Sequence, residues 1–186
     1  MKTAILGKDS PILRKIATPV PAAEIGTQKI KNIIERMRQV MHREDDAVAI
    51  AAPQIGESLR IFVVSGEALR RAQNINDDNS SDKESTRYPD LVFINPEIVK
   101  ISKKQRVVEE GCLSVRWLYG KVKRAEKITI RALDEKGRPV LRGASGLLAQ
   151  IFQHEIDHLN GIIFTDKATD LRELKPTRKK PLEKHG

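Results

Sequence analysis

Residues 145–161 read SGLLAQIFQHEIDHLNG and predict the helix around which the rest of the chain packs. The helix is expected to end at Asn160-Gly161, where glycine can adopt the left-handed conformation that closes a helix. On a wheel of about 100° per residue, one arc of roughly 200° holds the large apolar side chains together with His154, Glu155 and His158. Burying an unpaired carboxylate in such an arc costs several kcal/mol, so Glu155 is expected to have a compensating partner.

The spacing of the two histidines suits a metal site. Side chains at i and i+4 stand one above the other on a helix, so the imidazoles of His154 and His158 can bind one ion. Glu155 lies beside them, where it can accept a proton from an activated water. The alternative is a pair of core histidines hydrogen-bonded to the backbone, with Glu155 paired to an arginine. The position of the motif inside an apolar arc favours the metal site.

A third ligand has to come from outside this helix. One class of H-E-x-x-H enzymes would place a histidine at position 164, where this chain has Phe164, and another would use a downstream glutamate. Glu173 and Glu183 are downstream, but they lie in a proline-broken basic stretch with no helix to position them. Cys112 remains as the candidate, although a lone cysteine is more often a small buried hydrophobic residue. Two imidazoles and a thiolate leave a fourth position for water and indicate a metal softer than magnesium or calcium.

The composition fits one ordinary globular domain. Hydrophobic residues make up 39% and charged residues 32% of the 186, and no apolar run approaches the ~20 residues of a membrane-spanning helix. A single cysteine excludes an internal disulfide, and therefore a disulfide-stapled secreted fold, so a reducing, cytoplasmic setting is expected. The net charge of +9 favours polyanionic partners in general but identifies none.

The remaining segments predict an α+β fold with mixed or antiparallel strands packed around the central C-terminal helix. Helices are expected at 28–42, which is amphipathic, and at 145–159. Strands are expected at 59–64, 91–94, 98–101, 105–108 and 127–133, with Asn95-Pro96 between the second and the third. Residues 1–166 are expected to form a single catalytic domain with a polar surface insertion at 66–90, followed by a basic tail at 167–186.

Three segments together resemble the peptide deformylase family: AAPQIG at 51–56, EGCLS at 110–114 and QHEIDHLNG at 153–161. Their order and separations also match that family. The resemblance implies an enzyme that hydrolyses the formyl group from the N-terminal formyl-methionine of nascent polypeptides and releases formate. Two rival functions stay open: an H-E-x-x-H metallopeptidase, and a catalytically impaired, ribosome-associated relative.

The resemblance also implies roles for particular residues. Cys112, His154 and His158 would bind one divalent metal ion, natively Fe²⁺, although the sequence does not choose among iron, zinc, nickel and cobalt. Glu155 would act as general base and then as general acid. The side-chain amide of Gln54 and the backbone N–H of Leu113 would stabilise the developing oxyanion.

The substrate-binding residues are expected around this centre. They are Val48, Ala49, Glu110, Trp117, Tyr119 and Ile151. Trp117 and Tyr119 could form an apolar wall for the methionine side chain, or they could serve ordinary packing. The chain departs from the family at Ala47 and Ala49, where glycines are usual, and at Arg116, where a proline is common. The two methyl groups are expected to narrow the substrate groove, because glycine allows a closer approach of backbone.

The basic segment 175–184 resembles the C-terminal element by which some deformylases dock on the ribosome near the exit tunnel. A substrate that is a nascent chain would make such docking useful, but a merely solubilising tail explains the composition equally well. No membrane and no sequence-specific nucleic acid is expected as a partner.

Overall fold

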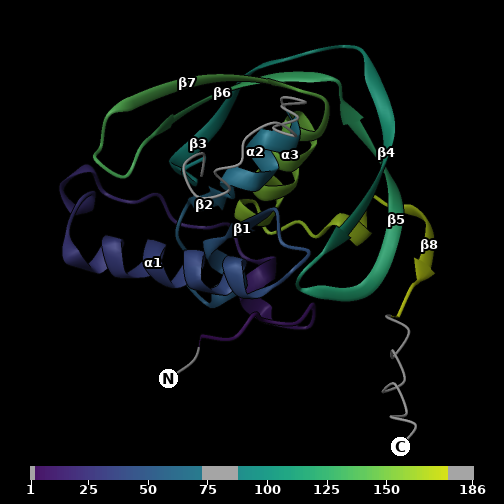
Figure 1. The fold of residues 1–186 in the computed structure, drawn as a ribbon, viewed down its shortest axis with the longest axis horizontal. Helices are drawn as coiled ribbons and strands as arrows, with labels where there is room; N and C mark the ends of the chain where they lie inside the picture. The colour runs from purple at the N-terminus through teal and green to yellow at the C-terminus, as the bar shows by residue number, and fades with distance from the viewer. Residues whose placement is uncertain (1–2, 73–87, 176–186) are drawn as a thin grey trace, which may run out of the picture.

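The computed structural model describes residues 3–72 and 88–175 and has a mixed α+β fold (Figure 1). Its helices are α1 (Gln28–Arg43), α2 (Gly66–Ala72) and α3 (Gly146–Leu159). Its strands are β1 (Ala49–Ala51), β2 (Ile61–Val64), β3 (Leu91–Ile101), β4 (Gln105–Cys112), β5 (Val115–Ala125), β6 (Lys127–Leu133), β7 (Pro139–Ser145) and β8 (Thr169–Glu173). Within these described residues, no helix is long and apolar enough to cross a bilayer.

Two antiparallel sheets surround α3. The larger has the order β1-β2-β3-β6-β7 and the smaller the order β4-β5-β8. Figure 1 shows α3 inside the curve made by β6 and β7 on one side and by β4 and β5 on the other. The helix therefore sits between the two sheets, where side chains on more than one of its faces meet strands.

The burial of α3 follows from its composition. Ten of its fourteen residues are buried, including the polar Gln153, Glu155 and Asp157. Phe152 packs against Phe62 of β2 and Phe93 of β3, with ring centroids 5.7 and 5.0 Å away. Fully burying such a side chain stabilises a fold by about 1.5–3 kcal/mol, so this aromatic cluster anchors α3 to the larger sheet.

Helix α1 buries one stripe of side chains and leaves the opposite face to solvent. The buried residues are Ile30, Ile33, Ile34, Met37, Val40 and Met41. They share a hydrophobic cluster with Ile50 of β1 and with Ile61 and Val63 of β2. Residues three and four apart fall on one side of a helix, so this periodicity places α1 against the sheet.

One expected boundary is wrong: Asn95-Pro96 does not separate two strands. Strand β3 runs through both residues, and its register against β6 shifts between Ile94 and Glu97. Asn95 has a φ of 52°, and its side chain exchanges two hydrogen bonds with the backbone of Val20, each 2.8 Å long. The tertiary contact holds the chain in an irregularity that a strand can absorb as a bulge.

The segments expected to be an insertion and a tail carry some regular structure. Residues 66–72 form α2, and 169–173 form β8, which pairs with β5. The rest of the expected insertion, 73–87, and the end of the expected tail, 176–186, lie outside the described residues.

Candidate metal centre

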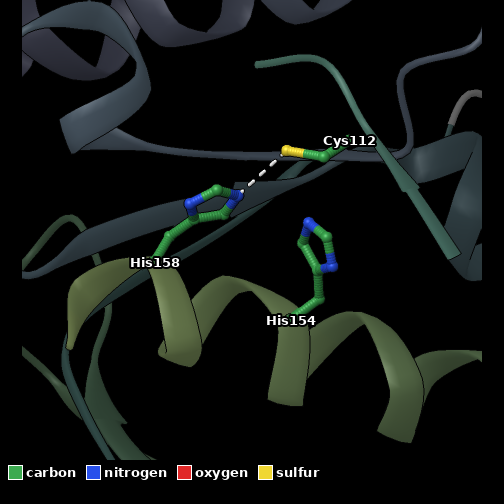
Figure 2. Close-up of side chains that lie close together, drawn as sticks. All are labelled: Cys112, His154 and His158. Atoms are coloured by element: carbon green, nitrogen blue, oxygen red, sulfur yellow. Dashed lines mark hydrogen bonds between the residues drawn. The ribbon is translucent and has the colours of Figure 1, made fainter. Parts of the chain in front are cut away.

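Three potential ligands from two distant segments meet in space (Figure 2). Cys112 ends β4, while His154 and His158 project from one face of α3 toward it. The ligand atoms of the three side chains all lie within 4.8 Å of one another. The Cys112 Sγ lies 3.2 Å from Nε2 of His158. The structure thus brings together the residues expected as the metal ligands.

The local backbone presents the cysteine at the helix. The register of β4 and β5 shifts after Gly111, and Cys112 then pairs with Val115 across a tight turn. A Cβ at position 111 would lie 2.8 Å from the Tyr119 ring, closer than real Cβ atoms come to a neighbour. Glycine is required here because the ring packs directly on the backbone.

The charge balance at the centre favours a cation. Burial alone would raise the pKa of the Cys112 thiol, but the charge of His158 and hydrogen bonds from both histidines place that pKa well below its usual range. Burial alone would lower the pKa of His154, but its contacts with Cys112 and Glu110 raise that pKa well above the ordinary value. A thiolate between two imidazoles is a donor set that suits a borderline or soft divalent ion, which can replace the protons.

Glu155 stands beside the ligands without a polar partner of its own. Its residue is 4% exposed, and among the described residues its Oε2 has no hydrogen-bond partner. Burial raises the pKa of Glu155 to about 7, despite the opposing charges of His154 and His158. A buried carboxyl oxygen with free hydrogen-bonding capacity next to a cation site is suited to hold and transfer a proton.

A buried ion-pair network orients His154. Its Nδ1 lies 2.9 Å from Oε2 of Glu110, and the Arg124 guanidinium binds both oxygens of Glu110, at 2.7 and 2.8 Å. Burial would raise the pKa of Glu110, but the hydrogen bonds from Arg124 and His154 lower it to about 2. Because a carboxylate only accepts, Nδ1 of His154 must carry the proton, and its Nε2 is left free for an ion.

The network continues on the far side of Arg124. Its Nη1 donates to Oδ2 of Asp157, which also accepts from Nζ of Lys167 at 2.8 Å. Asp157 and Gln153 had been assigned to the polar side of the helix wheel, yet both are buried. Gln153 exchanges two 3.0 Å hydrogen bonds with the backbone of Ala125. The polar side of α3 therefore binds the β5 strand instead of facing water.

Gln54 is held with its amide group facing the centre. Its Oε1 accepts a 2.9 Å hydrogen bond from the Ala51 N–H, which determines which end of the side chain donates. Its Nε2 lies 3.2 Å from the Ser114 Oγ and 3.6 Å from the Cys112 Sγ. The residue is 2% exposed, so its donor stands preorganised in a site largely closed to water.

A cavity of about 260 Å³ opens onto the centre. The lining includes every residue expected in the site except His158, namely Val48, Ala49, Gln54, Glu110, Cys112, Leu113, Trp117, Tyr119, Ile151, His154 and Glu155. The lining also includes residues that sequence reasoning did not assign to the site, among them Asp46, Glu109, Leu147 and Gln150. Only the acidic run at 44–46 carried a signal before the structure, since it precedes the AAPQIG segment closely.

Comparison with known proteins agrees with this geometry. Residues 2–174 match the family described as Polypeptide deformylase. A peptide deformylase of Psychrobacter cryohalolentis is 40% identical over 174 residues, 94% of this chain and 82% of the relative. One of Carboxydothermus hydrogenoformans is 41% identical over 162 residues, 87% of this chain and 90% of the relative. The Met-Ala-Ser-bound crystal structure of an Acinetobacter baumannii peptide deformylase has a TM-score of 0.74 at 32% identity, covering 90% of this chain and 99% of that one. The chain therefore belongs to the polypeptide deformylase family, as its three motifs predict.

Proposed function

We propose that this protein hydrolyses the formyl group from the N-terminal formyl-methionine of nascent polypeptides and releases formate. The observation that carries the proposal is the meeting of Cys112, His154 and His158 beside the buried Glu155 at a cavity. Its relatives are named peptide deformylase, and one was solved with bound Met-Ala-Ser. A peptide of that composition is the expected product of the reaction on its formylated form.

We propose that Cys112, His154 and His158 hold one divalent ion, with Fe²⁺ as the native metal and zinc, nickel and cobalt as alternatives. The buried Oε2 of Glu155 and the free Nε2 of His154 support the fit, because both atoms face a position where a cation and its water would satisfy them. When bound, such an ion acts as a Lewis acid that makes water nucleophilic near neutral pH.

Glu155 is the proposed proton carrier. Its carboxylate takes a proton from the attacking water and later gives it to the leaving amine of methionine. A pKa raised to about 7 by burial suits both directions of transfer. Negative charge develops on the formyl oxygen, and the Gln54 Nε2–H and the Leu113 backbone N–H are the proposed donors to it.

The methionine side chain is proposed to occupy the apolar part of the cavity, against Val48, Ile151, Trp117 and Tyr119. Ala49 would border the peptide backbone. Glu110 was expected to bind substrate, but its carboxylate is occupied by Arg124 and His154. Its proposed role is therefore to position His154.

The proposed catalytic unit extends past the boundary expected at 166, since β8 adds a third strand to the sheet that carries Cys112. Docking of the basic segment 175–184 on ribosomes and a cytoplasmic location stay part of the proposal, because the substrate is a nascent chain. Binding to ribosomes that does not change on deleting 176–186 would remove the docking element.

The test is formate release from formyl-Met-Ala-Ser by protein purified without oxygen, with metal content measured on the same sample. Formate release at about one metal ion per chain supports the proposal. Cleavage of internal bonds in an unblocked peptide without formate would establish the metallopeptidase instead. A metal-loaded protein that releases no formate would be the impaired relative.

A further inference from the structure

Arg116 links the two walls of the cavity. It lies on β5, two residues after Ser114, and its Nη1 donates to both carboxylate oxygens of Asp46 at 3.1 Å. Its Nη2 forms an ion pair with Glu44. Both acidic residues precede β1, so the arginine connects the segment before β1 to the segment that follows the cysteine. We call Glu44, Asp46 and Arg116 the acidic clasp.

The clasp is held from behind by Trp117. The Arg116 guanidinium carbon lies 5.5 Å from the Trp117 ring centroid, within range of a cation–π contact. Trp117 has a φ of 64°, which costs a bulky residue about 1–3 kcal/mol. Its carbonyl accepts a 2.7 Å hydrogen bond from the Leu174 N–H, just beyond β8. These contacts hold the guanidinium at the cavity edge, so the charges of the clasp have a defined place.

The clasp lies where the substrate chain must pass. Cys112 pairs with Val115 across the turn, and Arg116 follows, so its backbone starts within about 10 Å of the centre. An extended peptide advances about 3.3–3.6 Å per residue, which places the second and third residues of a formyl peptide at this distance. Asp46 and Arg116 both line the cavity.

The charge of the clasp is unbalanced, because one guanidinium faces two carboxylates and leaves a formal charge of −1. On the opposite wall, Glu109 is paired one to one with Arg172. Resting on the deformylase function proposed above, we propose that the acidic clasp is a specificity determinant that favours formyl-methionyl peptides with a basic second or third residue over those with an acidic one.

The expected size of the preference is modest. The side chains of Glu44 and Arg116 are 28% and 31% exposed and that of Asp46 is 54% exposed, so water and salt screen them. Exposed charge pairs contribute about 0.2–1 kcal/mol, which corresponds to at most about a fivefold ratio of kcat/KM between a lysine and a glutamate substrate. The preference should shrink in 0.5 M salt.

The test compares kcat/KM for formyl-Met-Ala-Lys against formyl-Met-Ala-Glu, and for formyl-Met-Lys-Ala against formyl-Met-Glu-Ala. Asp46→Asn and Glu44→Gln each neutralise the clasp and should bring the lysine-to-glutamate ratio close to one. Arg116→Gln makes the clasp more negative and should raise that ratio above the wild-type value. Arg131→Gln breaks an exposed pair with Glu97 on β3 and should leave the ratio unchanged.

The opposite signs separate charge from structure. A clasp that only holds the walls together would be broken by all three variants, which would then change both substrates alike and leave the ratio where it was. That result, or shifts of the same sign in Arg116→Gln and Asp46→Asn, overturns the proposal while formate release continues. Glu44→Gln provides the neutralising test should Asp46→Asn fail to fold. A wild-type enzyme that releases formate from none of the four peptides overturns the proposed function itself.

Discussion

At the scale of single residues, the centre depends on donors and acceptors whose roles are fixed by their neighbours. The Ala51 N–H occupies Oε1 of Gln54, so the other end of the amide must donate. The Glu110 carboxylate occupies Nδ1 of His154, so the other ring nitrogen is free. Glu155 differs from both, because its Oε2 has no partner among the described residues. Two side chains are thus committed in advance, and one remains available to move a proton.

Glu155→Gln should therefore abolish proton transfer while keeping the ligands. General acid–base catalysis contributes about 10²–10⁴-fold, and kcat/KM for formyl-Met-Ala-Ser should fall by that order. Metal content per chain, measured on the same preparation, should stay at the wild-type value. Unchanged deformylation would show that another residue carries the proton.

Gln54→Leu should remove one oxyanion donor. The loss of such a donor lowers kcat by about 10²–10³-fold, with a much smaller change in KM, because the donor acts on charge that develops in the transition state. Ser114→Ala is the matched control, since it removes the 3.2 Å partner of the Gln54 amide and leaves the donor in place. Steady-state kinetics should show a far smaller loss in Ser114→Ala, and equal losses would assign the effect to packing.

At the scale of elements, α3 and the β4–β5 pair form one unit that holds the ligands. Gln153 hydrogen-bonds the end of β5, and Arg124 of β5 joins Glu110 of β4 to Asp157 of α3. The Arg124 side chain is 4% exposed, so these charges are nearly removed from water. Breaking such a network is costly because it leaves carboxylates buried without a partner.

Arg124→Gln should lower the free energy of unfolding by about 3–5 kcal/mol, since Glu110 and Asp157 would lose their shared cation. Urea denaturation followed by circular dichroism measures the change. Arg131→Gln, which breaks an exposed pair, should shift the same quantity by no more than about 1 kcal/mol. A similar loss in both variants would mean that the buried network adds nothing special.

Gly111→Ala should disturb both the hairpin and the ligand that ends it. The added methyl would lie 2.8 Å from the Tyr119 ring, and overpacking of this kind costs about 1–3 kcal/mol. Because Cys112 follows directly, affinity for cobalt or nickel should fall as well. Gly143→Ala on β7 is the control, since nothing lies within 4 Å of its added Cβ. Adding Tyr119→Ala to Gly111→Ala should restore part of the stability, and no recovery would contradict the proposed clash.

At the scale of the whole molecule, the metal should couple the two sheets. Cys112 belongs to the smaller sheet, while α3 is anchored to the larger one by Phe152. An ion held by residues of both parts would bind the folded state only. Such binding stabilises by about 2.7 kcal/mol when the free ligand is at a hundred times its Kd.

Removal of the metal by a chelator should therefore lower Tm and abolish formate release together. Adding back Fe²⁺, Ni²⁺ or Co²⁺ without oxygen should restore both, as measured by differential scanning calorimetry and a formate assay on one sample. Cys112→Ser should weaken the metal-dependent rise in Tm. Loss of activity with no change in Tm would mean that the site does not link the two sheets.

The sequence alone determined what depends on short-range spacing. The amphipathic stripe of residues 28–42 and the one-face placement of His154 and His158 follow from helical periodicity, and the structure contains both helices. Family membership followed from three motifs and is confirmed by the match over residues 2–174. The roles of the individual site residues stay predictions, although the structure brings them around one cavity.

Only the tertiary structure decided the contacts between residues far apart in the chain. Asn95-Pro96 has the local signature of a turn, but hydrogen bonds with Val20, 75 residues away, keep it within a strand. Arg116 replaced an expected proline for no reason visible nearby, until folding placed Glu44 and Asp46 beside it. Local spacing sets which side chains share a face of one element. The packing of elements, which is driven by burial of apolar surface, sets which charges then have to meet.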